Sequence, residues 1–124
     1  MLDFWDPGEV ESPPLVPEPP IDRAHLDRMT LGDQRLEAEV LELFARQARM
    51  LLDRMPQADR AGVAALAHTI NGSARAIGAW PISRAARAVQ EAAVTGDDRG
   101  PAMAALQAAV GEALVVIAEL AHAS

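Results

Sequence analysis

The sequence predicts an all-α protein, an antiparallel up-down four-helix bundle preceded by a short extra helix. Alanine and leucine dominate, aromatic residues make up only 3%, and tyrosine is absent, which favours packed helices over sheet. From residue 22 onward, apolar residues recur at helical spacing. Capping residues, glycines and prolines divide this pattern into segments with short links, and 124 residues allow one small core.

Residues 1–21 are expected to form a proline-rich, acidic tail that is extended or disordered, ahead of one helical domain over residues 22–124. Six of the nine prolines lie in the tail, and six acids but no base precede Arg23. Proline cannot donate a backbone hydrogen bond, and like charges repel. Within the tail, Leu2, Phe4 and Trp5 form an apolar cluster. We favour a cluster that folds back onto the domain or frays, and a short partner-docking motif stays open.

The first two helices are bounded by polar and proline signals. A short helix is expected over residues 22–29. The next runs from about Asp33, an N-cap candidate, to about Met55, where Pro56 stops it. Its apolar residues at helical spacing, expected on the core side, are Leu36, Val40, Leu43, Phe44, Met50 and Leu51.

The remaining helices follow the same logic. A third helix begins near the N-cap candidate Asp59 and ends at Ile77, because Gly78 offers a left-handed C-cap. Pro81 then occupies the first turn of a new helix, where its missing N–H costs nothing. The last two helices are expected over about residues 81–95 and 101–121.

Charge and composition exclude several functional classes. The formal net charge is −7 and the bases are all arginine, so no basic stripe is available for nucleic acid or anionic lipid. Cysteine is absent, which removes disulfides and thiolate chemistry. The first residues carry no basic leader, and no apolar run reaches the roughly 18 residues of a membrane span. We expect a soluble, cytoplasmic monomer that contacts neither nucleic acid nor membrane.

One face of the expected third helix carries unusual residues. Counting about 100° per residue from Val63, the large apolar residues share one side, whereas His68, Gly72 and Arg75 fall roughly 120–180° away. Glycine inside a helix costs about 1 kcal/mol relative to alanine. Gly72 therefore either permits close helix packing or leaves room for an approaching partner or phosphoryl group, and the residues alone do not decide.

An outward imidazole has few chemical roles available here. Zinc would need partner ligands, and neither His25 nor His122 supplies one at suitable spacing. A general base would need an orienting carboxylate and a cleft. A neutral ring nitrogen is a competent nucleophile by itself. Arg75, on the same face, is positioned to hydrogen-bond a phosphoryl group on that ring, although a solvated arginine is the commoner case.

The segment AHTINGSARAIGA, residues 67–79, resembles the signature of the histidine-containing phosphotransfer (HPt) family. In that signature a histidine is followed by two residues, a lysine and a glycine, and then by a second glycine six residues later. His68, Gly72 and Gly78 match, and Asn71 stands at the lysine position. The flanking segments LELFARQARMLLDRM and ISRAARAVQEAA are similar to the helices on either side, so the resemblance covers roughly residues 24–120.

The resemblance implies a four-helix bundle that relays phosphoryl groups in a two-component system. His68 would take a phosphoryl group from the aspartate of one receiver domain and pass it to another. Gln90 would hold the other ring nitrogen. The partners would be response-regulator receivers, a hybrid histidine kinase, or both. The receiver would bring Mg²⁺, so the bundle would be a non-enzymatic intermediate without cofactor or metal. Small residues beside the histidine, Ala64, Ala65 and Gly72, would form the docking surface.

Asn71 departs from the family pattern because it carries no charge. We hypothesise that Arg75 supplies the missing cation. Three alternatives stay open: a degenerate HPt-like adaptor that binds receivers or other partners without phosphotransfer, the helical dimerisation part of a histidine kinase, and a helical adaptor that works through Phe4 and Trp5.

Overall fold

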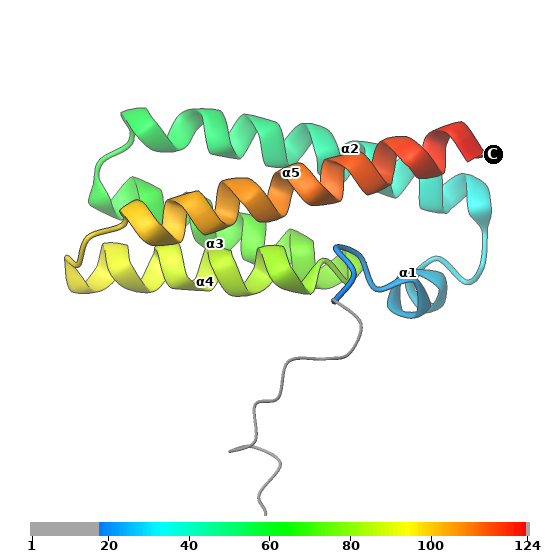
Figure 1. Cartoon of the computed structure of the whole chain (residues 1–124), viewed down its shortest axis with the longest axis horizontal. Helices are drawn as coiled ribbons and strands as arrows, with labels where there is room; N and C mark the ends of the chain where they lie inside the picture. The colour runs from blue at the N-terminus through cyan, green and yellow to red at the C-terminus, as the bar shows by residue number, and fades with distance from the viewer. Residues whose placement is uncertain (1–17, 124) are drawn as a thin grey trace, which may run out of the picture.

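A computed structural model of the chain describes residues 18–123 (Figure 1), and the cluster of Leu2, Phe4 and Trp5 lies outside them. In this range the chain forms α-helices and a short 3₁₀ turn without strands, which confirms the all-α prediction. Four long helices run side by side, and the short first helix lies at one end of the bundle (Figure 1). The helices are α1 (Arg23–Met29), α2 (Gln34–Arg54), α3 (Arg60–Ile77), α4 (Trp80–Thr95) and α5 (Gly100–Ala123), with the 3₁₀ turn η2 (Met55–Gln57) after α2.

Side-chain caps start the helices where the sequence predicts. The Asp33 carboxylate accepts hydrogen bonds from the backbone N–H groups of Arg35 and Leu36 at the start of α2. The Asp59 carboxylate accepts one from Gly62 N at 2.8 Å at the start of α3. Each cap satisfies N–H groups that the first turn of a helix leaves without a partner.

The turn between α3 and α4 is short and anchors α1. Gly78 ends α3 with φ +83°, in the left-handed region, and its carbonyl accepts a hydrogen bond from Asp22 N at 2.8 Å. The Asp22 carboxylate accepts a second from Trp80 Nε1 at 3.0 Å, and the His25 ring packs edge-on to Trp80 with 4.9 Å between ring centroids. The short helix is thereby fixed against the end of the bundle.

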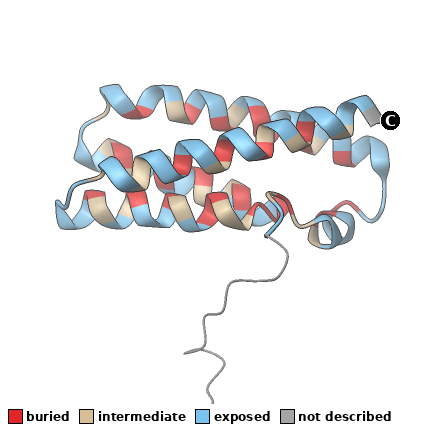
Figure 2. Cartoon of the chain, in the orientation of Figure 1, coloured by how far each residue is buried: buried red, intermediate tan, exposed pale blue. Residues whose placement is uncertain are grey.

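The core lies between the long helices, with buried residues on their inward sides (Figure 2). Alanine recurs in it, so the backbones of α3 and α4 approach closely, and Ile70, Ile82, Leu106 and Val110 fill the centre. Burial of this kind stabilises the bundle by about 25 cal/mol per Å² of apolar area.

Two expectations need correction. Leu36, Leu43 and Met50, expected on the core side of α2, are 41%, 59% and 45% exposed. They lie seven residues apart and so form a second apolar stripe, next to the buried one that contains Leu41 and Phe44. The tail was expected to reach residue 21, but Ile21 is 2% exposed in the core.

Helix α5 is more apolar than the sequence expectation allowed. By length and composition, Gly100–His122 could cross a membrane, with a mean hydropathy of 1.7, although one such helix is weak evidence. In the structure it packs against α2 and α4. Only 17% of its most apolar window is buried within the bundle, so α5 is apolar well beyond the stripe that faces the core.

The Asp22 contacts predict a pH dependence of stability. The Trp80 indole hydrogen bond, with help from the His25 backbone N–H, lowers the pKa of Asp22 below its usual 3.8. The stabilisation is therefore complete above about pH 4 and is lost as the pH falls through the lowered pKa. An NMR titration of the Trp80 indole resonance should give a midpoint below 3.8. In Trp80→Phe the Asp22 side-chain resonances should titrate closer to the usual value, and an equal midpoint in both proteins would contradict this prediction.

Candidate functional site

The outer face of α3 holds the candidate site. Its inner face buries Val63, Ala67, Ile70, Ala74 and Ile77, each at most 3% exposed. His68, Gly72 and Arg75 are exposed on the other side, as the helical spacing predicts. Within residues 18–123 the His68 ring makes no hydrogen bond, so both nitrogens are open to an incoming group. The helix therefore presents a bare imidazole to solvent.

Space beside His68 comes from Gly72. A Cβ built on this glycine would meet no atom of the described residues within 4 Å. Close packing within the chain consequently does not require glycine at this position, which removes one of the two explanations left open by the sequence. The clearance lies one helical turn beyond His68, on the exposed side.

Asn71 turns toward α4. The Ser83 hydroxyl, itself buried, donates a hydrogen bond to Asn71 Oδ1 at 2.5 Å. Asn71 is only half-exposed, and its carboxamide oxygen is occupied in joining two helices. The residue at the lysine position of the HPt signature is thus neutral and partly committed to packing.

The contact between Asn71 and Ser83 also shows the register of α4 against α3, that is, which residues of the two helices lie at the same height along the bundle. These helices are antiparallel neighbours (Figure 1). Because the two helices run in opposite directions, His68, three residues before Asn71, lies at about the level of Ala86, three residues after Ser83. Arg87 is the next residue on α4 and therefore lies close to the level of the imidazole. Arg87 is exposed and makes no ion pair within the described range, whereas Arg84 pairs with Glu18. Arg87 is not among the residues predicted from the sequence, and its place three residues before Gln90 is the signal that could have indicated it.

Gln90 is half-exposed on α4, about one turn from that level. No hydrogen bond joins it to His68 in the described part of the chain. Its contact with the imidazole stays a prediction. A side chain that leans toward the N-terminal end of α4 moves toward the level of His68, so the placement suits the expected role.

On the other side, α2 borders the site with apolar residues. Leu43 and Gln47 line a shallow groove together with Ser73 and Ala76 of α3. Because α2 and α3 are antiparallel, two turns further along α2 from Leu43 correspond to two turns back along α3 from Ala76. These steps lead to Met50 on α2 and to Thr69, the neighbour of His68, on α3. The exposed apolar stripe of α2 therefore extends to the level of Thr69, the residue after His68 in the chain. Ala65 is exposed and Ala64 half-exposed on α3, so the surface around the ring is low and partly apolar.

No group of three or more His, Asp or Glu side chains that could hold a metal ion occurs among residues 18–123. The exposed groups on or next to this face that could act chemically include the His68 imidazole and the guanidinium groups of Arg75 and Arg87. An imidazole on a rigid helix, with clearance and positive charge beside it, is suited to carry a phosphoryl group.

The structure is a helical bundle that exposes a histidine on the outer face of α3. Residues 39–123 match the family model of the Hpt domain, and the chain belongs to this family. No curated protein and no solved structure matches the chain. Hpt domains serve as histidine phosphotransfer intermediates in phosphorelays, without being catalytic enzymes, and typically interact with receiver domains.

Proposed function

We propose that His68 accepts a phosphoryl group from a receiver-domain aspartate and passes it to the aspartate of a second receiver. The observation that carries this proposal is the bare, exposed imidazole of His68 beside the open space at Gly72. In a phosphorelay inside the cell, the partners would be response regulators, a hybrid histidine kinase, or both, and the chain would act as a monomer.

The proposed step balances without a group from this chain other than the ring. A neutral ring nitrogen of His68 attacks the phosphorus of the aspartyl phosphate, the N–P bond forms, and the bond from phosphorus to the carboxylate oxygen breaks. The aspartate leaves as a carboxylate, and the reverse step loads the second receiver. Because transfer depends on alignment and charge stabilisation, the receiver's Mg²⁺ and the positive charge around His68 share that work.

Receiver docking would use the surface that surrounds the ring. Ala64, Ala65 and Gly72 keep it low, so a receiver can bring its aspartate close to the imidazole. The exposed Leu43 and Met50 of α2 add apolar area next to it, as interface centres usually do. Gln90 would orient the ring by accepting or donating at the nitrogen that does not react.

Arg75 and Arg87 together would supply the positive charge that the lysine of the HPt signature carries and that Asn71, at the same position, does not. Arg75 is on α3 itself and Arg87 approaches from α4. We expect Arg75→Ala and Arg87→Ala each to shorten the phosphohistidine lifetime or slow its formation roughly tenfold, and the double variant more, because charge-assisted hydrogen bonds hold phosphoryl oxygens. Decay of ³²P-labelled protein measures the lifetime.

Arg35→Ala provides the control for loss of charge, because Arg35 is exposed at the start of α2. This substitution should leave the rates of phosphohistidine formation and decay unchanged. If Arg75→Ala has no effect on formation or lifetime, then Arg75 is not the substitute. If the double variant also behaves like the wild type, then neither arginine supports the phosphoryl group.

One observation favours a second candidate, an adaptor that binds receivers without phosphotransfer. The Asn71 carboxamide is neutral and bonded to Ser83, which weakens electrostatic support for a phosphorylated ring. The two candidates separate when the chain is incubated with phosphorylated receivers and then with a second, unphosphorylated receiver. Relay predicts label on the wild-type chain and then on the second receiver, and neither on His68→Gln. An adaptor predicts binding of the receiver by both proteins without label on either.

A further inference from the structure

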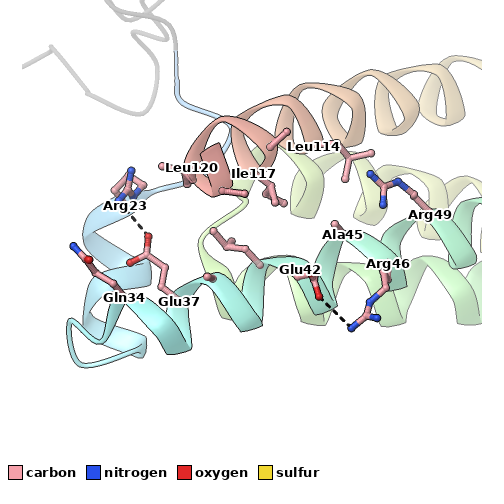
Figure 3. Close-up of a pocket in the computed structure, with 14 residues that line it drawn as sticks. Arg23, Gln34, Glu37, Glu42, Ala45, Arg46, Arg49, Leu114, Ile117 and Leu120 are labelled. Atoms are coloured by element: carbon pink, nitrogen blue, oxygen red, sulfur yellow. Dashed lines mark hydrogen bonds and ion pairs between the residues drawn. The ribbon is translucent and has the colours of Figure 1, made fainter. Parts of the chain in front are cut away.

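A groove lies between α2, from Gln34 to Arg49, and the second half of α5 (Figure 3). Its volume is about 400 Å³, and Arg23 is the only described residue outside these two helices that lines it. Apolar side chains form much of its wall, namely Leu41, Ala45, Leu114, Ile117 and Leu120. Since residues of α3 and α4 do not line it, the groove is separate from the face of His68.

Three arginines and two glutamates are among the residues that line this groove. Arg23 is paired with Glu37 at 3.2 Å, so that pair is close to neutral. Arg46 lies 3.7 Å from Glu42, with both side chains largely exposed, a pair of little strength. Arg49 makes no ion pair among the described residues. The mouth of the groove thus offers a small excess of positive charge beside an apolar wall. No charged side chain of the described residues lines the groove between α2 and α3.

Helix α5 indicates that this wall lacks a cover. A helix that is apolar on all sides is normally buried, but only 17% of the most apolar window of α5 is buried. Leu114, Val116 and Leu120 are only half-buried, and Val115 is 59% exposed. An apolar occupant of the groove would remove part of this surface from water.

The chain itself contains a segment with matching chemistry. Residues 1–17 include Phe4 and Trp5 between Asp3 and Asp6, and they carry acids but no base. The body of the chain is fixed where this segment joins it, because Ile21 is buried and Glu18 pairs with Arg84. Arg23, five residues after Glu18, already lines the groove.

The available length of chain is sufficient. Thirteen residue steps separate Trp5 from Glu18, and an extended chain spans about 3.3–3.6 Å per residue, hence at most about 43–47 Å. The α2 wall from Gln34 to Arg49 extends about 22 Å at 1.5 Å per residue. Trp5 can therefore reach any point along the groove.

We propose that residues 1–17 fold back and dock in the α2–α5 groove. Phe4 and Trp5 lie against Leu114 and Ile117, and the acids beside them face Arg46 and Arg49. The docked segment leaves the His68 face open, so this device caps the apolar side of the bundle while the phosphoryl site remains accessible. The inference does not depend on the proposed function.

The chain contains no cysteine, so a single introduced thiol can carry a spin label on the intact protein. With Ser12→Cys labelled, docking predicts paramagnetic broadening of the backbone amides of Ala45 and Ile117, and little at Gly72. Uniform broadening over the whole surface would overturn the proposal, and so would broadening at Ser73 and Ala76 instead of at the groove. A mixture of spin-labelled unenriched chain and unlabelled ¹⁵N chain should show none, because broadening there would mean that a second copy occupies the groove.

Charge reversal tests the complementarity. Arg46→Glu with Arg49→Glu should abolish the broadening at Ile117, and adding Asp3→Arg with Asp6→Arg should restore it. Reversing Arg35 and Arg54 instead serves as the matched control and should leave the broadening at Ile117 unchanged, because both arginines are exposed on α2 and neither lines the groove. If the broadening is lost in the arginine variant and is not restored by the second pair of changes, the assigned charge pairing is wrong. If the broadening persists in the Phe4→Ala/Trp5→Ala double variant, these two side chains do not anchor the segment. Phosphoryl transfer is a separate readout, so failure of either idea is recognisable.

Discussion

Replacement of Gly72 by leucine should slow phosphoryl transfer between the chain and a receiver by roughly 10–100-fold, while the bundle unfolds at the same or a higher denaturant concentration. The stability expectation follows from two facts: a side chain at Gly72 meets nothing within 4 Å, and leucine favours a helix over glycine by about 0.5–1 kcal/mol. The kinetic loss follows because the leucine occupies the approach to His68, and misplacing reacting groups by about 1 Å is costly.

Gly111 supplies a matched control for this experiment. It too is an exposed glycine inside a helix, on α5, where an added Cβ would meet nothing within 4 Å. Gly111→Leu should raise stability by a similar amount and leave transfer unchanged. Stopped-flow or quenched-label kinetics and urea unfolding give the two readouts. Equal transfer rates in both variants would show that a receiver does not need the space at Gly72.

The second large effect concerns Gly78, the last glycine of the HPt signature. Gly78→Ala should lower the free energy of unfolding by about 2–4 kcal/mol. Its φ of +83° disfavours any side chain, and a Cβ would lie 3.0 Å from the carbonyl oxygen of Asp22 and 3.2 Å from His25 Cβ. Because the Asp22 oxygen belongs to the backbone, relief would require α1 to move away from the α3–α4 turn.

Gly96 provides a control that separates the cost of a left-handed backbone conformation from the cost of the steric clash with Asp22 and His25. It has a similar φ of +82°, but there a Cβ would meet only the guanidinium of Arg60, the mobile end of a side chain. Gly96→Ala should therefore cost only about 1 kcal/mol. Urea unfolding of both variants measures the difference. Equal losses would mean that the contact between Gly78 and α1 contributes nothing, and that the left-handed conformation explains the whole effect.

Much of the fold could be predicted from local chemistry. Asp33 and Asp59 cap α2 and α3 at the expected positions, and Gly78 ends α3 as its left-handed conformation requires. These signals act within one helical turn, so a single sequence contains them. The outward placement of His68 and Gly72 was likewise predictable, because helical periodicity fixes which residues share a face.

The remainder depends on contacts between helices that periodicity does not encode. Two apolar stripes run along α2, and spacing cannot tell that Met50 is exposed while Leu51 is buried. The hydrogen bond between Asn71 and Ser83 depends on the register of α3 against α4. The same register brings Arg87 to the level of His68, which no local pattern announces. Burial of Ile21 similarly arises from packing of the segment before α1 against the bundle.

The most direct test of the central claim is to locate the phosphoryl group on the loaded protein. After incubation with a phosphorylated receiver, ³¹P NMR and tandem mass spectrometry of the intact chain should reveal one acid-labile phosphoramidate, on a ring nitrogen of His68. The His68→Gln protein, treated alike, should remain unmodified. Phosphate on His25 or His122, or label that persists in His68→Gln, would contradict the account.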